Sequence, residues 1–124
     1  MKVYIAGLFE ARHRLRAERD WLAKQPGYEI VSTWMDEETT AIVSDPVYKK
    51  QLTDYATRDL QELEGADLVI LDTCDMDCRG GREIEAGYAF CNGSDVWVVG
   101  PPKNIFHLLM PNFAGWGALR QYIA

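Results

Sequence analysis

Cysteine and long apolar runs are scarce in this chain of 124 residues, and each scarcity excludes a class of protein. The three cysteines are Cys74, Cys78 and Cys91. Their number is odd and the first two are spaced C-x3-C, which argues against a disulfide scaffold and against a zinc site. The longest apolar runs, such as residues 68–71, are far too short to span a membrane. We therefore expect a reduced, cytoplasmic protein.

Positive charge is also limited, because 13 lysines and arginines face 19 aspartates and glutamates, giving a formal net charge of −6. A general binder of nucleic-acid polymers needs a basic stripe, so this class is not expected. A small anionic ligand held by a few arginines stays compatible with the charge. The N-terminal segment becomes charged at Glu10 and Arg12, which is not typical of a secretory signal.

The length fits one domain over residues 1–124. Apolar runs and breakers predict strands at residues 2–6, 28–34, 67–72 and 95–99. Helices are predicted at residues 11–25, 47–64 and 116–123, and a further helix opens within the segment 79–89 and stops at Asn92-Gly93. An irregular loop is predicted over 35–45 and a turn at 111–112. Strands separated by helices indicate an α/β fold with right-handed crossovers and a parallel sheet.

Ligands of such sheets bind outside the carboxyl ends of the strands. Gly7, the segment 72–81 and Gly100 each follow a predicted strand. We therefore expect these residues to lie at one edge of the sheet and to form the binding site.

The most informative segment is residues 79–89, which follows the predicted central strand and opens a helix. Gly80 and Gly81 allow the backbone to approach a ligand closely, and the helix start offers free N–H groups and a positive dipole end. Glu83 and Glu85 lie in the first turn. From position alone, a carboxylate there serves equally as a nucleophile, a general base or a helix-start charge.

Asp59 is the second unusual residue. At 100° per residue it falls inside the apolar stripe of the helix predicted over 47–64, four residues from both Tyr55 and Leu63. An inward-facing carboxylate is costly unless it is paired or used. Either an arginine such as Arg58 or Arg82 pairs with it, or it belongs to a functional site.

Other polar residues support weaker readings. Asp72, Asp75 and Asp77 form an acidic loop, for which a solvated turn is favoured over a Mg²⁺ site. Arg79 and Arg82 flank the glycines, where they would hold a phosphate or carboxylate or be ordinary surface charge. No metal site is predicted.

Four pieces of the sequence, in order along most of the chain, resemble the nucleoside 2-deoxyribosyltransferase family. They are the opening V-Y-I-A-G at residues 3–7, Arg58-Asp59, Ala66-Asp67, and G-R-E-I-E-A-G-Y-A at residues 81–89. The superfamily includes the 2'-deoxynucleoside 5'-phosphate N-hydrolases. The resemblance implies a flavodoxin-like three-layer sandwich with a parallel sheet of four to five strands.

The resemblance also implies roles for individual residues. The family's nucleophilic glutamate falls on Glu85, the aspartate that contacts the leaving base on Asp59, and the tyrosine that orients the nucleophile on Tyr4. The residues expected to bind the substrate are Gly7, Asp72, Arg79, Gly80 and Gly81. The chemistry needs no metal or organic cofactor.

One position departs from the family pattern. Six residues before the nucleophile the transferases have an aspartate and the 5'-phosphate hydrolases a serine, whereas this chain has Arg79. We hypothesise that Arg79, with the amides of Gly80 and Gly81, favours a substrate that carries a 5'-phosphate.

The sequence thus predicts an enzyme that cleaves or transfers the N-glycosidic bond of 2'-deoxynucleosides or their 5'-monophosphates through a covalent glycosyl-Glu85 intermediate. The alternatives are a nucleoside-monophosphate phosphoribohydrolase, a non-catalytic nucleotide-sensing module and a partner domain without a ligand. The family implies a homodimer or higher homo-oligomer. Phe106, Met110, Phe113 and Trp116 are then candidates for the interface or, equally, for the core.

Overall fold

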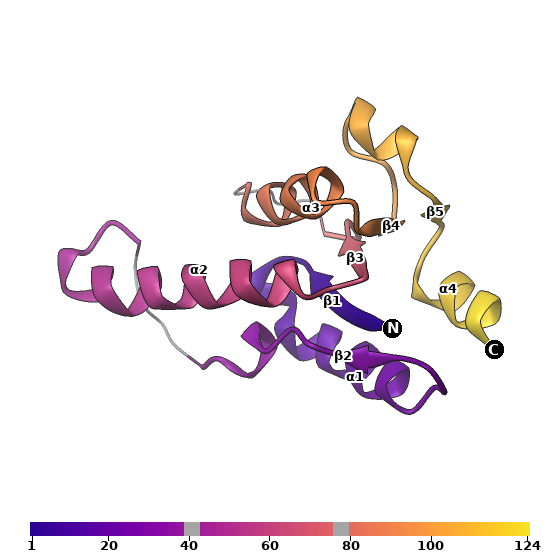
Figure 1. Cartoon of the computed structure of the whole chain (residues 1–124), viewed down its shortest axis with the longest axis horizontal. Helices are drawn as coiled ribbons and strands as arrows, with labels where there is room; N and C mark the ends of the chain where they lie inside the picture. The colour runs from indigo at the N-terminus through magenta and orange to yellow at the C-terminus, as the bar shows by residue number, and fades with distance from the viewer. Residues whose placement is uncertain (39–42, 76–79) are drawn as a thin grey trace.

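The computed structural model describes residues 1–38, 43–75 and 80–124, and its centre is a five-stranded parallel sheet (Figure 1). The strands are β1 (Lys2–Ala6), β2 (Glu29–Ile30), β3 (Leu68–Asp72), β4 (Asp95–Val99) and β5 (Asn112–Phe113). Their spatial order is β2-β1-β3-β4-β5, the order of flavodoxin-like folds. The predicted α/β fold with a flavodoxin-like sheet is therefore confirmed.

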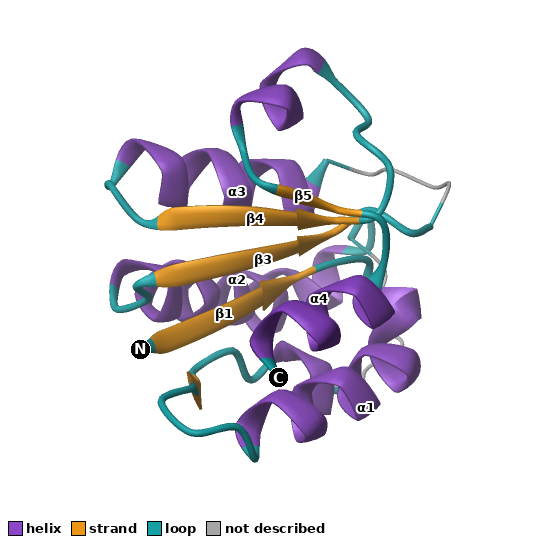
Figure 2. Cartoon of the chain, turned by 90° about the vertical axis from the view of Figure 1, so that its right-hand side faces the viewer, coloured by secondary structure: helices purple, strands orange, loops and turns teal. Residues whose placement is uncertain are grey.

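Helices cover both faces of the sheet. They are α1 (Arg12–Ala23), α2 (Lys49–Glu64), α3 (Gly81–Cys91) and α4 (Trp116–Ile123). In Figure 2, α1 and α4 lie in front of the strands and α2 and α3 behind them. All five residues of β3 are buried, as its run of apolar residues without alternation predicts for a central strand. The sheet and the two helical layers together make the three-layer sandwich.

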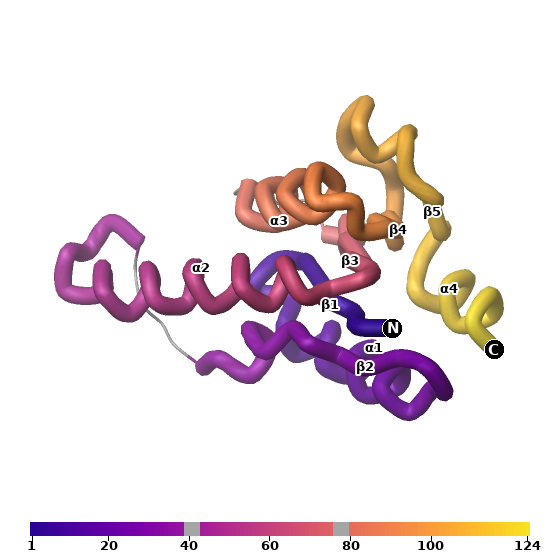
Figure 3. Tube along the Cα trace, viewed as in Figure 1, coloured from indigo at the N-terminus to yellow at the C-terminus, as the bar shows by residue number. Residues whose placement is uncertain are grey.

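The helix α2 extends beyond the sheet that it covers. In Figures 1 and 3 its N-terminal half extends past the strands. Every residue of α2 is described, and Leu63 is the one that is fully buried. The rest of the predicted apolar stripe, Leu52, Tyr55 and Ala56, stays partly or fully exposed. The C-terminal turn of α2 is therefore what attaches this helix to the core.

The second strand is shorter than the predicted 28–34. Its ladder with β1 ends because side chains replace the backbone as partners of Ile5. The Ile5 N–H donates to Ser32 Oγ at 3.1 Å, and Trp34 Nε1 donates to the Ile5 carbonyl at 2.6 Å. The chain then closes a 3-10 turn at Trp34–Asp36 within the segment predicted as an irregular loop.

The C-terminal region also differs from the prediction. The segment predicted as a turn at residues 111–112 leads into the edge strand β5, which pairs with Val98 and Val99 of β4. Before it, a 3-10 helix spans Ile105–Leu109, and the Asn104 side chain caps it by accepting from the N–H groups of Phe106 and His107. A two-residue strand has too little pattern to be recognised in the sequence.

The start of α2 differs in detail. A 3-10 turn at Pro46–Tyr48 precedes the helix, which begins at Lys49 instead of Val47. Asp45 caps this turn by accepting from the Val47 N–H at 3.1 Å. Among the described residues, no helix is long and apolar enough to cross a membrane.

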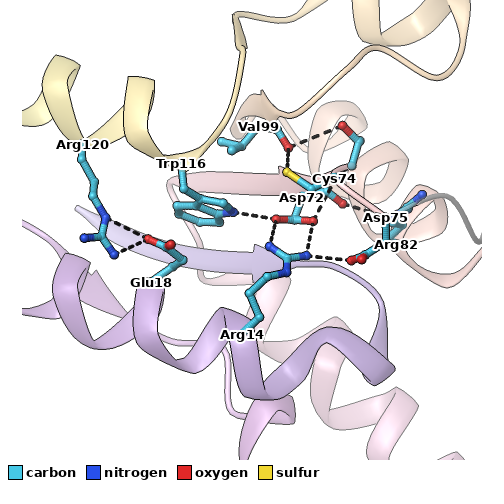
Figure 4. A network of polar contacts seen from close by, with 10 residues as sticks. Arg14, Glu18, Asp72, Cys74, Asp75, Arg82, Val99, Trp116 and Arg120 are labelled. Atoms are coloured by element: carbon cyan, nitrogen blue, oxygen red, sulfur yellow. Dashed lines mark hydrogen bonds and ion pairs between the residues drawn. The ribbon is translucent and has the colours of Figure 1, made fainter.

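A buried carboxylate at the end of β3 joins several elements (Figure 4). Asp72 is fully buried and pairs with Arg14 of α1 at 3.0 and 3.1 Å. It also accepts from Trp116 Nε1 of α4 at 2.6 Å and from the Cys74 N–H at 3.1 Å. Arg82 of α3 donates to its backbone carbonyl at 3.2 Å. Asp72 therefore holds α1, α4 and the start of α3 at one edge of the sheet.

We expect Asp72→Asn to lower the free energy of unfolding by about 1–3 kcal/mol, because an amide cannot accept all of these hydrogen bonds and leaves Arg14 without its buried partner. Urea unfolding at neutral pH measures the change. Asp54→Asn is the matched control, because Asp54 is exposed and its partner within the described residues is Lys50 on the same helix face. Equal stability of the two variants would contradict the structural role of Asp72.

Candidate functional site

A pocket of about 200 Å³ opens at the carboxyl ends of β1 and β3, between the starts of α1 and α3 and the side of α2. The residues that line it are Gly7, Leu8, Phe9, Glu10, Trp34, Glu37, Asp59, Gly80, Gly81, Arg82 and Glu85. This is the edge at which the sequence predicts the site. Four of the lining side chains are carboxylates, so the pocket is predominantly acidic.

Gly7 follows β1 and lines the pocket at a place where a Cβ would be crowded. A Cβ at Gly7 would lie 2.7 Å from Leu15 Cδ1 and 3.5 Å from Asp72 Cβ. A side chain at this position would therefore have to push aside the end of the Leu15 side chain and would contact Asp72.

The carboxyl group of Glu85 is the most unusual group in the pocket. Its Oε2 atom is buried and accepts no hydrogen bond of standard geometry from the described part of the chain. Burial raises the pKa of Glu85 to about 8; the neighbouring Tyr4 hydroxyl lowers it, whereas the charges of Asp59 and Glu62 add to the increase. The position thus holds a desolvated carboxyl group of a kind that is frequent at functional sites.

Tyr4 lies directly behind Glu85. Its side chain is fully buried, and its hydroxyl likewise makes no hydrogen bond of standard geometry within the described residues. Burial raises the pKa of Tyr4 far above its ordinary value, and the charge of Glu85 raises it further. The hydroxyl is therefore a permanent donor at the pH of the cell, and Glu85 is the acceptor next to it.

Asp59 and Glu37 share one arginine on another wall. Arg58 Nη2 donates to Asp59 Oδ1 at 3.0 Å and to Glu37 Oε1. Burial raises the pKa of Asp59 to about 6; Arg58 opposes this increase, and Glu37 and Glu62 strengthen it. The pairing with an arginine that the sequence suggests for Asp59 is therefore present, and Asp59 also lines the pocket, while its functional role stays a prediction.

A hydrogen-bonded turn places the aromatic wall. Glu62 of α2 accepts from the N–H and the hydroxyl of Thr33, at 3.1 and 2.7 Å. This fixes the chain just before Trp34, whose indole N–H is bound to the Ile5 carbonyl at 2.6 Å. The Trp34 ring is 6% exposed and offers a rigid flat surface for a planar ligand.

The start of α3 closes the remaining side. Gly80 has a positive φ of 89°, a conformation that favours glycine, and it directly precedes the helix. Gly81 and the buried Arg82 follow and also line the pocket. First-turn N–H groups and the positive end of the helix dipole therefore meet this side of the cavity.

Most of the predicted site residues come together here. Glu85, Asp59, Gly7, Gly80 and Gly81 all line the pocket. Tyr4 stands behind Glu85 without lining the pocket itself. Arg79 lies outside the described residues.

Asp72 is the exception among the residues predicted to bind the substrate. It is absent from the pocket lining, and its buried carboxylate is occupied by Arg14, Trp116 and the Cys74 N–H. From the sequence alone, a carboxylate that follows a central strand has two possible roles, which are binding a substrate and stabilising the fold. The partners of Asp72 on α1 and α4 give it the structural role.

Several lining residues were missed in the sequence: Phe9, Glu10, Trp34 and Glu37. Phe9 and Glu10 belong to a 3-10 turn at Phe9–Ala11 that was not predicted before α1. Glu37 lies in the acidic segment interpreted as an irregular loop. Its proximity to Arg58 depends on a contact across 21 positions of sequence, for which no local pattern exists.

The C-terminal aromatic residues divide between core and surface. Trp116 is 8% exposed, and Phe113 packs against Trp97 and Tyr122. Phe106 is 63% exposed and borders an apolar hollow with Phe90, Leu109 and Met110. Of the candidates for an interface, Phe106 and Met110 are therefore the ones that face the surface hollow.

No family model matches the chain, and no curated protein is significantly similar to it in sequence. Solved structures do resemble it. A 2-deoxyribosyltransferase from Bacillus psychrosaccharolyticus superposes with a TM-score of 0.71 at 17% identity, over 98% of this chain and 92% of that one. The CMP N-glycosidase of Clostridium botulinum gives 0.61 at 16% identity, over 98% and 97%. These likenesses show the fold, which is the fold implied by the sequence resemblance.

We expect Glu85→Gln to stabilise the protein increasingly as the pH rises from 5 to 8. Because the folded-state pKa of Glu85 is raised to about 8, the stability it contributes is complete below the unfolded value near 4.5 and is lost as the pH rises toward 8. Glutamine does not titrate, so the gain over wild type should reach roughly 1–3 kcal/mol at pH 8.

Urea unfolding of both proteins at several pH values measures this difference. Glu29→Gln, at an exposed position of β2, is the control for which the difference should not grow. A pH-independent difference for Glu85→Gln would mean that Glu85 is ionised and well accommodated in the free protein.

Proposed function

We propose that this protein cleaves the N-glycosidic bond of 2'-deoxynucleosides or their 5'-monophosphates and passes the deoxyribosyl group to water or to a second base. The observation that carries the proposal is the desolvated carboxyl group of Glu85, with a buried oxygen that lacks a partner among the described residues, in a pocket shared with Asp59. The two structures of similar fold are named as a 2-deoxyribosyltransferase and a CMP N-glycosidase, which supports this reaction class.

In the first step Glu85 attacks C1' of the deoxyribose. A bond forms between a carboxylate oxygen and C1', and the bond between C1' and the base nitrogen breaks with its electron pair passing to the base. Asp59, in its protonated form, gives its proton to the departing base. In the second step water or another base attacks C1' and releases Glu85, and the proton lost by the attacking group returns to Asp59.

The acidic lining suits the charge that develops. Breaking the bond generates oxocarbenium character, and hence positive charge, on the sugar. Glu10, Glu37 and Glu85 line the cavity and provide negative charge or hydrogen-bond acceptors. Without a 2'-hydroxyl the cation forms more easily, so deoxyribose is the natural sugar. Glu37, together with Glu62 outside the lining, also raises the pKa of Asp59 beyond the effect of its burial.

Tyr4 positions the nucleophile in this scheme. As a buried, permanently protonated donor it stabilises the ionised form of Glu85 and fixes which oxygen faces the sugar. Glu62 contributes indirectly by fixing the chain before Trp34, against which the base stacks.

A second candidate is the hydrolysis of ribonucleotides, because the neighbour from Clostridium botulinum is named for CMP. The catalytic groups would be the same, and the sugar would carry a 2'-hydroxyl. Turnover of CMP compared with the deoxy form of the same nucleotide separates this reading from the first.

The apolar hollow beside α3 supports assembly with a second copy of the chain. Phe90, Phe106 and Leu109 are 48%, 63% and 70% exposed around a cavity of about 390 Å³. Contiguous apolar surface of this kind is characteristic of protein–protein contacts. We therefore include a homo-oligomer in the proposal.

We expect Glu85→Ala to reduce the rate by roughly 10³-fold or more, because it removes the proposed nucleophile. The wild-type kcat/KM should be highest between about pH 6 and pH 8, since ionised Glu85 and protonated Asp59 must coexist. Chromatography of the four deoxynucleosides and their 5'-monophosphates, with and without a second free base, measures both.

Free base released without an acceptor identifies a hydrolase, and a new nucleoside formed only with an acceptor identifies a transferase. Glu29→Gln is the control that should leave the rate unchanged, because Glu29 is exposed on β2. Wild type and Glu85→Ala equally inert on every substrate would refute the catalytic proposal and favour a sensing module.

We expect Arg79→Asp to shift the preference from deoxynucleoside 5'-monophosphates toward deoxynucleosides by about tenfold or more, because a guanidinium is exchanged for a carboxylate at the position that the resemblance places near the 5' end of the sugar. The ratio of kcat/KM for each nucleotide and its nucleoside is the measurement. Lys103→Asp supplies a control for the change in net charge. An unchanged ratio for Arg79→Asp would exclude Arg79 from phosphate recognition.

A further inference from the structure

We propose that Glu37 selects the base, by accepting a hydrogen bond from an exocyclic amino group, so that cytosine and adenine are preferred over uracil, thymine and hypoxanthine. This inference rests on the proposed function, because it takes the pocket to hold a nucleoside or nucleotide. It assigns a specificity-determining residue outside the set that the sequence predicts.

The position of Glu37 places it at the base end of the pocket. Its carboxylate and that of Asp59 are joined through a single nitrogen, Arg58 Nη2, and both line the same cavity. Asp59 is the residue proposed to act on the base. A carboxylate linked to it through one nitrogen atom therefore reaches the same part of the substrate.

The Glu37 side chain is held firmly. It is 12% exposed, and its partner Arg58 lies over the ring of Tyr55 at 5.0 Å. The Glu37 N–H donates to the Trp34 carbonyl at 3.1 Å, which closes the turn that carries the aromatic wall. One short segment thus supplies a flat ring for stacking and, next to it, an acceptor for the edge of the base.

The carboxylate has one oxygen left for a ligand. Arg58 occupies Oε1, and within the described part of the chain Oε2 of Glu37 accepts no hydrogen bond. An ionised carboxylate can only accept. The free oxygen of Glu37 therefore attracts donor groups and repels carbonyl oxygens, whether or not Asp59 carries its proton.

The bases differ in the group that they offer to such an acceptor. Cytosine presents the N4 amino group and adenine the N6 amino group, whereas thymine and uracil present the O4 carbonyl and hypoxanthine the O6 carbonyl. A carbonyl oxygen beside Glu37 leaves the carboxylate without a donor and adds repulsion between lone pairs. Sites built around one hydrogen bond discriminate strongly against analogues that cannot make it.

The test uses substrate pairs that differ by one amino-to-oxo exchange: deoxycytidine and deoxyuridine, deoxyadenosine and deoxyinosine, and their 5'-monophosphates. Wild type should favour the amino member of each pair by about ten- to a hundredfold in kcat/KM. Glu37→Gln, whose amide can also donate, should bring this ratio to within about threefold of unity. Glu38→Gln is the matched control, because the adjacent Glu38 pairs with Arg16 outside the pocket and its loss should leave the ratio unchanged.

Folding of each variant is verified by thermal unfolding. If Glu37→Gln does not fold, Glu37→Asp keeps the charge and withdraws it by one methylene, and it should lower the ratio. A wild-type ratio near one, a preference for oxo bases, or a ratio that neither variant changes would overturn the proposal.

A binding measurement distinguishes the failure of this proposal from the failure of the proposed function. Calorimetric titration of Glu85→Gln with deoxycytidine and deoxyuridine 5'-monophosphates needs no turnover. If the wild type turns over none of the substrates and Glu85→Gln binds the cytosine nucleotide more tightly by about tenfold or more, the result would support base selection by Glu37. It would at the same time refute the proposed enzymatic activity. Equal binding, or no binding of either nucleotide, would overturn the proposal for Glu37.

Discussion

The carboxylate of Asp72 is the interaction on which the rest of this structure depends. It ends the central strand β3, it is fully buried, and it takes hydrogen bonds from Arg14 of α1 and Trp116 of α4 (Figure 4). Through its own carbonyl it also receives Arg82, three residues before Glu85 on α3. A group with these partners holds α1, α4 and the start of α3 around the end of β3, next to the pocket that Arg82 lines.

The electrostatics of the pocket oppose the stability of the fold. Glu85 is desolvated, Asp59 has one guanidinium that it shares with Glu37, and Tyr4 is buried with no hydrogen bond of standard geometry in the described chain. Arrangements of this kind persist where the surrounding structure imposes them, and they are typical of functional sites. The sheet and the Asp72 contacts supply that surrounding structure, and in the proposed reaction the site would stabilise the positive charge that develops at C1' as the bond breaks.

The sequence predicts the elements whose patterns are local. Residues 2–6, 95–99 and 116–123 coincide with β1, β4 and α4. Asp59 stands out because it interrupts an apolar stripe, and Glu85 because it follows two glycines at the start of a helix. The short strands β2 and β5 carry too few residues for a pattern. Ser32 and Trp34 end the ladder of β2 through side-chain bonds that only tertiary packing reveals. Glu37 was not predicted as a pocket residue for the same reason, since its partner Arg58 lies on another element.

The uneven burial of α2 has a consequence for how such a protein diverges. Leu63 near its end attaches the helix to the core, while the first turns extend beyond the sheet (Figure 1). Substitutions in those turns and in the segment before them leave the core packing intact, so they cost little stability. The wall formed by Glu37 and Arg58 borders this lightly attached region, whereas Glu85 and Tyr4 belong to the rigid centre. Descendants of this chain can therefore acquire new ligand preferences by changing the periphery, while Glu85 and Tyr4, for which we propose the chemistry, stay in place.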